Sequence, residues 1–118
     1  MSLASTSYRD LTQSVSKTLA PFRTNAPDLM KGFGDMARAA TRDGVLDKKT
    51  KELIALALSV ACHCDPCIGF HVQALVKLGA TRQEVEETLG MAVYMGGGPS
   101  LMYSANALAA FEELSAEA

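Results

Sequence analysis

Apolar residues recur along most of the chain at intervals of three and four, which is the spacing of one face of an α-helix. No segment alternates apolar and polar residues with a period of two, so the sequence predicts no strand. The spacing predicts helices over about 27–41, 48–61, 64–78, 81–96 and from 99 onward. We therefore expect an all-α fold, a single-domain bundle of five to six short helices.

Local signals mark the ends of several of these helices. Asp47 is a suitable N-cap for the helix that begins at residue 48, and Thr81 with Glu84 forms a capping box for the next helix but one. Gly79 suits the position just beyond a helix C-terminus. In the helix over 48–61 we expect a mostly buried face formed by Leu53, Ile54, Ala57, Leu58 and Ala61, widened by Leu56 and Val60.

The same helical spacing predicts which residues of the last helix, and which methionines, are buried. In the last helix this spacing predicts an apolar face formed by Leu101, Met102, Ala105, Leu108 and Phe111. Five methionines also fall at helical spacing, and we expect them to pack in the core: Met30, Met36, Met91, Met95 and Met102.

Residues 1–25 are rich in Ser and Thr, with few apolar positions. Leu11, Val15 and Leu19 keep helical spacing, so we expect a weakly docked N-terminal helix that Pro21 ends, in front of a helical domain over 26–118. The first residues contain no basic stretch leading into an apolar run, and therefore no recognisable signal peptide. No apolar run approaches the length that spans a bilayer. We expect a soluble, cytoplasmic protein.

The charge and the cysteine content narrow the function. Eleven basic and thirteen acidic residues give a net charge of −2, which provides no electrostatic surface for nucleic acid or for an anionic membrane. Cys62, Cys64 and Cys67 lie within six residues. A chain without export features does not suggest a disulfide scaffold. The clustering therefore indicates metal or redox chemistry.

The sequence Cys64-Asp65-Pro66-Cys67 stands at the start of a predicted helix. Its spacing places both sulfurs on one face of the first turn, close enough to form a disulfide. The free backbone N–H groups and the helix dipole favour a negative thiolate at this position. Pro66 fits the first turn, where it removes no hydrogen bond.

Two further side chains are candidates for proton transfer. His71 shares the helix face of Cys64 and Cys67, where an imidazole can accept or relay a thiol proton. Glu52 is a plausible general base. In an uninterrupted helix Glu52 would lie about 120° away from Cys64, and a break near His63 would remove that constraint.

Glu52 followed by Cys64-x-x-Cys67-x-x-x-His71 resembles the active-site signature of the alkylhydroperoxidase-D (AhpD) and carboxymuconolactone decarboxylase family, over about residues 28–112. The resemblance implies an AhpD-like all-α fold that forms homo-oligomers: dimers, trimers or hexamers. It implies a thiol-dependent hydroperoxide reductase or disulfide oxidoreductase that acts on small hydroperoxides and is reset by an external dithiol reductant, without metal, flavin or haem. Cys67 would attack the peroxide, Cys64 would resolve the sulfenic acid, and Glu52 and His71 would form the proton relay.

One departure from the signature concerns this relay. The best-studied branch of the family has a histidine directly before its second cysteine, where this chain has Pro66. The relay would therefore be one member short, and the activity modest or the substrate different. Cys62 and His63 match no part of the signature.

Other interpretations remain open. The cysteines are either redox-active or buried structural thiols, and a zinc site would use Cys62, Cys64, Cys67 and His71, although structural zinc sites usually join two ligand pairs across a longer loop. A second possible function is decarboxylation of a small lactone acid, as in the family's other branch. That reaction needs no cysteine pair, so the presence of Cys64 and Cys67 counts against it. A third interpretation is a non-enzymatic, redox-sensing module whose oligomeric state depends on whether the disulfide is formed.

Overall fold

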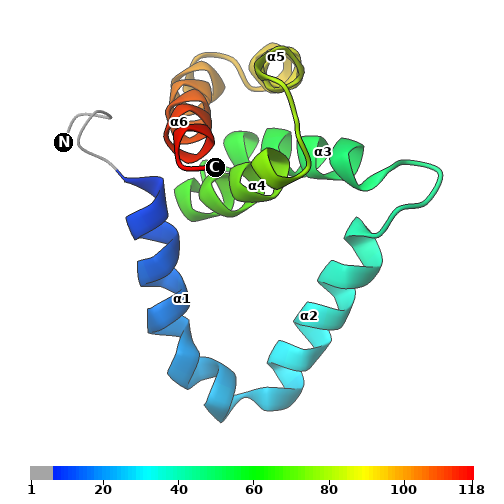
Figure 1. Ribbon diagram of the computed structural model, residues 1–118, viewed down its shortest axis with the longest axis vertical. Coiled ribbons are helices and arrows are strands. Elements are labelled where there is room, and N and C mark those ends of the chain that lie inside the picture. The colour runs from blue at the N-terminus through cyan, green and yellow to red at the C-terminus, as the bar shows by residue number, and fades with distance from the viewer. Residues whose placement is uncertain (1–6) are drawn as a thin grey trace.

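A computed structural model describes residues 7–118, and within them the chain forms six α-helices and no strand. The helices are α1 (Tyr8–Asn25), α2 (Pro27–Thr41), α3 (Lys48–Ala61), α4 (Asp65–Lys77), α5 (Arg82–Gly96) and α6 (Gly98–Ala116) (Figure 1). The predicted all-α fold is confirmed. None of the described helices is long and apolar enough to cross a membrane. The first six residues of the expected N-terminal segment lie outside the described residues.

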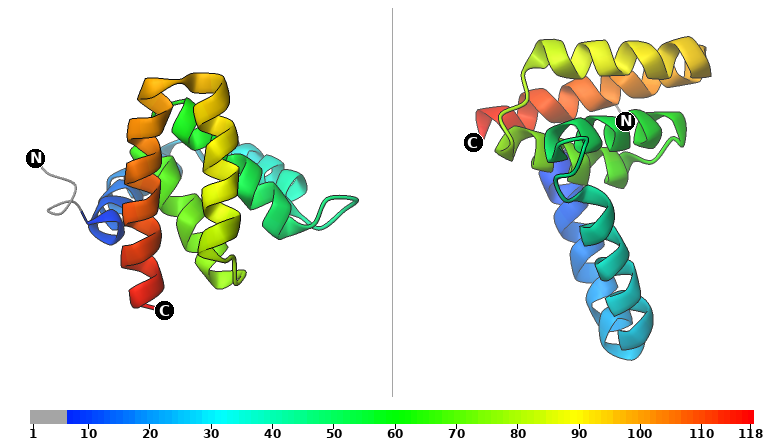
Figure 2. Two further views of the ribbon diagram at one scale, coloured as in Figure 1. Left: turned by 90° about the horizontal axis from the view of Figure 1, so that it is seen from above. Right: turned by 90° about the vertical axis from the view of Figure 1, so that its right-hand side faces the viewer.

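Helices α3 to α6 form the body of the molecule. The α3–α4 pair lies beside the antiparallel α5–α6 pair, and α1 docks against α4 and α6 (Figure 2). Helices α1 and α3 to α6 contribute apolar side chains to one core, and burial of each large side chain stabilises the fold by roughly 1.5–3 kcal/mol. The largest fully buried apolar residues are Tyr8, Leu56, Val60, Ile68, Val72, Leu75 and Val85.

The start of α1 is held firmly against the body. Tyr8 is only 1% exposed, and its backbone N–H donates to the Glu113 carboxylate of α6 at 2.7 Å. Burial opposes ionisation of Glu113, but donors from the start of α1 outweigh it and lower the pKa of this carboxyl. At Gly69 of α4 the two helices approach so closely that a Cβ atom would lie 2.6 Å from Cγ2 of the buried Thr12.

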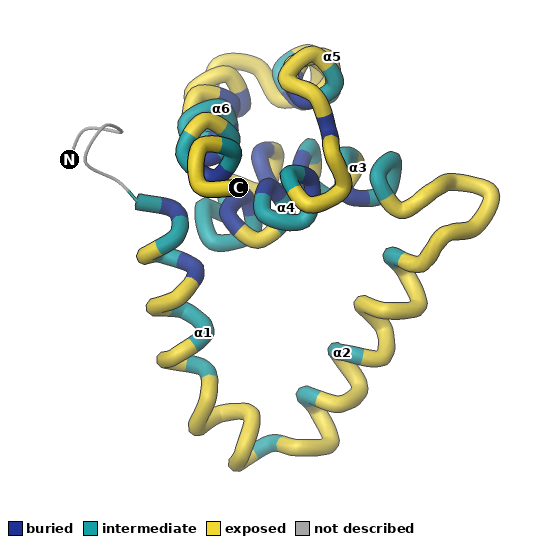
Figure 3. Tube along the Cα trace, viewed as in Figure 1, coloured by how far each residue is buried: buried dark blue, intermediate teal, exposed yellow. Residues whose placement is uncertain are grey.

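Pro21 does not end α1, contrary to our expectation, because the helix continues to Asn25. A proline removes one N–H donor from a helix. The carbonyl that this donor would have bonded is that of Lys17, four residues earlier, and because Lys17 is exposed, water can satisfy it. The end of α1 and all of α2 extend away from the body and form a V (Figures 1 and 3). No residue of α2 is buried.

The hydrophobic pattern predicted the wrong buried face for several segments. In α3, Ile54 and Leu58 are exposed, whereas Leu56 and Val60 are fully buried. The expected methionine core is also wrong, because four of the five methionines are 60–79% exposed: Met36, Met91, Met95 and Met102. These side chains cover the outer surfaces of the helices.

In α6 the buried face consists of four small residues and one leucine. Leu101 and Met102 point outward, and the buried positions are Ser100, Ser104, Ala107, Ala110 and Leu114. Close packing explains the choice, because a Cβ atom at Gly96 would collide with Ser100. The hydroxyl of Ser104 donates to the Ser100 carbonyl at 2.8 Å, so its burial leaves no polar group unsatisfied.

Candidate active site around Cys64 and Cys67

A tight turn between α3 and α4 creates the cysteine site. Cys62 caps α3, and His63 adopts a left-handed conformation with φ 56°. The His63 N–H donates to the Val60 carbonyl at 3.1 Å, and the Cys64 N–H donates to the Ser59 carbonyl at 3.0 Å. This pair of bonds is the Schellman motif, which ends a helix and redirects the chain. The helix break anticipated near His63 is therefore present.

Cys64 is both the last residue of the Schellman motif and the first residue of the next structural element. It is the N-cap of α4, where its Sγ accepts a hydrogen bond from the Cys67 N–H at 3.3 Å. The two sulfurs share the first helical turn, as the spacing predicted, and form a disulfide with the Cα atoms 5.2 Å apart. The sulfurs are therefore held where the backbone donors and the helix dipole favour negative charge.

Asp65, the first residue of α4, is anchored by two residues that the sequence did not identify. Its Oδ1 accepts hydrogen bonds from the Tyr8 hydroxyl at 2.8 Å and from the Asn106 amide at 3.0 Å. Burial and the neighbouring Asp65 carboxylate raise the pKa of Tyr8, so its hydroxyl stays protonated and acts as a donor. Helices α1 and α6 thus fix the start of the cysteine-bearing helix.

The turn also brings Glu52 of α3 against His71 of α4. Glu52 Oε2 lies 2.9 Å from His71 Nδ1, and the carboxylate side chain is 6% exposed whereas the histidine is 32% exposed. A carboxylate only accepts, so Nδ1 carries the proton and Nε2 of a neutral ring is left as an acceptor. This arrangement can orient an imidazole as a base.

An open pocket joins these groups. It has a volume of about 280 Å³ and is lined by Ala55, Leu58, Ser59, Cys62, Cys64, Cys67 and His71. Glu52 does not line the pocket and contacts it only through His71. The exposed Cys62 carries a free thiol. The wall from α3 was not predicted, although Ala55 lies two helical turns before Cys62, and Leu58 and Ser59 lie one turn before it, all on the same face.

The predicted site residues do not form a metal cage. Residues 7–118 contain no group of three or more His, Cys, Asp or Glu side chains placed to hold a metal ion. Two of the four residues that a zinc site would need, Cys64 and Cys67, are bonded to each other, and a third, His71, faces Glu52.

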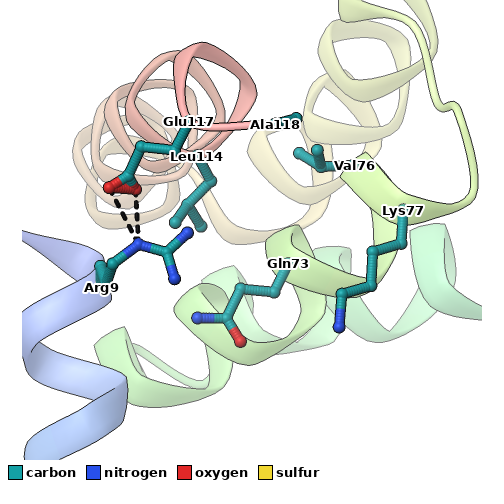
Figure 4. A pocket seen from close by; sticks show the side chains of 7 residues that line it. All are labelled: Arg9, Gln73, Val76, Lys77, Leu114, Glu117 and Ala118. Carbon is teal, nitrogen blue, oxygen red and sulfur yellow. Dashed lines mark hydrogen bonds and ion pairs between the residues drawn. The ribbon is translucent and has the colours of Figure 1, made fainter.

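A second pocket lies near the opposite end of α4. It is lined by Arg9, Gln73, Val76, Lys77, Leu114, Glu117 and Ala118 (Figure 4). An ion pair between Arg9 and Glu117, with Nε and Oε2 2.6 Å apart, lies in its wall. None of the predicted site residues reaches this pocket, so the candidate chemistry belongs to the cysteine pocket.

Comparison with known proteins identifies the family. Residues 27–110 match the model of the carboxymuconolactone decarboxylase family. An uncharacterised protein of Cupriavidus necator is 44% identical over 90 residues, which are 76% of this chain and 80% of the relative. An uncharacterised protein encoded in the cox locus of Paracoccus denitrificans is 34% identical over 82 residues, 70% of this chain and 74% of the relative.

Solved structures agree with this result. The apo form of a carboxymuconolactone decarboxylase family protein from Legionella pneumophila is 65% identical, with a TM-score of 0.90 and coverage of 92% of this chain and 96% of the other. A family member from Thermotoga maritima, for which an involvement in the antioxidative response has been suggested, is 32% identical, with a TM-score of 0.78 and coverage of 87% and 88%. The chain belongs to the carboxymuconolactone decarboxylase family.

Proposed function

We propose that this protein is a thiol-dependent hydroperoxide reductase that cycles between the Cys64–Cys67 disulfide and the dithiol. The observation that carries the proposal is the disulfide in the first turn of α4, in one pocket with an imidazole that a buried carboxylate orients. The suggested antioxidative involvement of the Thermotoga maritima relative supports it. The cycle needs a reducing compartment, and we propose the cytoplasm.

The reaction begins with a proton transfer. His71 Nε2 accepts the proton of the Cys67 thiol, and Glu52 stabilises the resulting imidazolium through Nδ1. The thiolate attacks the terminal oxygen of the hydroperoxide, the O–O bond breaks, and the alcohol leaves with the proton from His71. Cys67 is now a sulfenic acid. The position of His71 one turn after Cys67, on the same face, supports Cys67 as the attacking residue.

The second half of the cycle restores the thiols. The Cys64 thiol attacks the sulfenic sulfur of Cys67, which forms the disulfide and releases water. An external dithiol then reduces the disulfide by exchange and becomes oxidised itself. Pro66 stands where the best-studied branch of the family has a histidine, so His71 and Glu52 form the whole relay here.

A single-turnover experiment tests this function. Reduced protein mixed with an alkyl hydroperoxide should consume one equivalent, form the corresponding alcohol and lose two thiols, with Cys64 and Cys67 bonded in the peptide map. The apolar walls at Ala55 and Leu58 favour an alkyl hydroperoxide over hydrogen peroxide. Cys62→Ser is the matched control and should retain full stoichiometry. The proposal is rejected if no hydroperoxide is consumed in the presence of a dithiol reductant.

A variant without the cysteine pair tests the family's other activity. Decarboxylation of a small lactone acid by a variant that lacks both Cys64 and Cys67 would support a decarboxylase instead. That result, together with no consumption of hydroperoxide by the wild-type protein, would replace the redox assignment.

We also propose that the chain works as a homo-oligomer. Helix α2 has no buried residue, and Leu29, Phe33 and Met36 on it are 60–61% exposed. Contiguous apolar surface of this kind on a soluble chain marks an interaction site. A second copy of this chain is the partner that this family implies.

Light scattering after size exclusion tests the assembly. Phe33→Lys should shift the protein to smaller species, because a charge on the apolar side of α2 must be desolvated in an interface. Lys31→Glu on the same helix is the control and should leave the mass unchanged. A wild-type protein that is monomeric at all concentrations would contradict the proposal.

A further inference from the structure

The turn before Cys64 has an unusual residue at its left-handed position. The same Schellman motif recurs at the end of α4, where the equivalent residue is Gly79 with φ 76° and the corresponding bonds are 3.1 and 3.0 Å. Glycine is the usual choice because a Cβ atom disfavours this conformation. At the cysteine turn the position is His63, so the protein holds a side chain there against a backbone preference.

The side chain of His63 has a specific contact. Its ring stacks on Tyr103 of α6, with the ring centroids 4.6 Å apart and the planes inclined by 14°. His63 does not line the cysteine pocket. The stack therefore links the turn to α6 without touching the reacting sulfurs, and it offsets the conformational preference against a non-glycine residue at this turn.

The next residue along the chain depends on this turn. The Cys64 N–H supplies one of the two hydrogen bonds of the motif, and its side chain caps α4. In the oxidised protein the disulfide also holds Cys64 beside Cys67. After reduction that covalent link is gone, and the turn and the cap alone keep the two thiols together.

We propose that His63 is a positioning residue: its stacking on Tyr103 holds the left-handed turn that keeps Cys64 beside Cys67 in the reduced protein. The inference deepens the proposed function. It rests on a redox-active cysteine pair and not on a hydroperoxide as the oxidant.

The thiol–disulfide equilibrium with glutathione measures this positioning. Glutathione disulfide takes two electrons from the pair, so that Cys64 and Cys67 lose their protons and become bonded while two glutathione thiols form. Thiols that are held together oxidise more favourably, because less conformational freedom is lost when the bond closes. Loss of the stack should therefore lower the equilibrium constant for oxidation.

Five variants define the test. His63→Ala and Tyr103→Leu should each lower the equilibrium constant roughly three- to tenfold, the worth of an aromatic pair. The double variant should show little further loss, because both changes remove one contact. Tyr103→Phe keeps the ring and should match the wild type, and His63→Phe should restore most of the equilibrium constant.

Gly79→Ala is the matched control for general destabilisation. It strains the same motif at the other end of α4, where a Cβ would meet no atom but the positive φ disfavours alanine. It should lower the melting temperature of the reduced protein without changing the glutathione equilibrium. An equal change in that equilibrium for Gly79→Ala, or an unchanged equilibrium in folded His63→Ala and Tyr103→Leu, would overturn the inference.

The two proposals fail separately. A protein that consumes no hydroperoxide but shows the expected shifts with glutathione supports the positioning role and overturns only the peroxidase assignment. Hydroperoxide reduction by the wild type, together with a wild-type glutathione equilibrium in folded His63→Ala, Tyr103→Leu and the double variant, overturns only the positioning role.

Discussion

Cys67→Ser is expected to abolish hydroperoxide reduction, and Cys64→Ser to stop at a sulfenic acid on Cys67 when no dithiol donor is present. The first change removes the thiolate that attacks the peroxide. The second leaves that thiolate but removes the neighbouring thiol that condenses with the sulfenic acid, so without a dithiol donor the reaction ends at the sulfenic acid and no Cys64–Cys67 disulfide forms. Hydroperoxide consumption and intact-protein mass spectrometry after a sulfenic-acid trap separate the two outcomes.

Cys62→Ser is the control for these variants because Cys62 lines the same pocket and carries a free thiol. It should turn over at the wild-type rate. A sulfenic acid trapped on Cys64 in the Cys67→Ser protein would reverse the assignment of the two cysteines. Continued cycling of Cys64→Ser through Cys62 would show that the exposed thiol can resolve the intermediate, contrary to the proposal.

Glu52→Gln is expected to lower the turnover rate about 10²-fold with little loss of stability, whereas His71→Leu should lower both. Proton transfer by a positioned base contributes roughly 10²–10⁴-fold to a rate. Glutamine keeps an acceptor for His71 Nδ1 but removes the charge that stabilises the imidazolium. His71→Leu leaves the buried Glu52 carboxylate without its partner, which destabilises a protein by about 3–5 kcal/mol when the charge stays buried.

Urea unfolding and single-turnover kinetics measure the two effects independently. Glu86→Gln is the matched control, because Glu86 is also paired, with Arg82 at 2.9 Å, but this pair lies on the surface. It should leave both quantities unchanged. Equal turnover in the wild type and folded Glu52→Gln would remove Glu52 from the relay.

Signals between near neighbours made the helix ends predictable. The capping box of Thr81 and Glu84 and the N-cap at Asp47 are both present, because each joins groups three residues apart. The shared turn of Cys64 and Cys67 was predictable for the same reason. The contact of Glu52 with His71 depended on how the chain reverses at His63, and the residue type gave no sign that a histidine would adopt a left-handed conformation there.

The buried faces of α3 and α6 could not be read from hydrophobicity. Leu101 and Met102 are more apolar than Ser100 and Ser104, yet the serines are buried, and Ser100 lies so close to Gly96 that a Cβ atom on the glycine would collide with it. An apolar pattern shows which residues avoid water, but it does not distinguish the core of one chain from a surface that another molecule covers. The anchoring of Asp65 by Tyr8 and Asn106 was likewise invisible, because it joins three helices far apart in sequence.

The docking of α1 has a kinetic consequence. Helices α3 to α6 follow one another through short connections, whereas the bonds between Tyr8 and Glu113 join residues 105 positions apart. Contacts that close such long loops form late in folding. Only Tyr8 and Thr12 of α1 are buried, so this helix has fewer contacts than the body to resist local opening. We expect α1 to exchange its amide protons ahead of the body. Each such opening releases Asp65 from Tyr8, so the start of α4 and its two sulfurs experience the fluctuations of a helix at the other end of the chain.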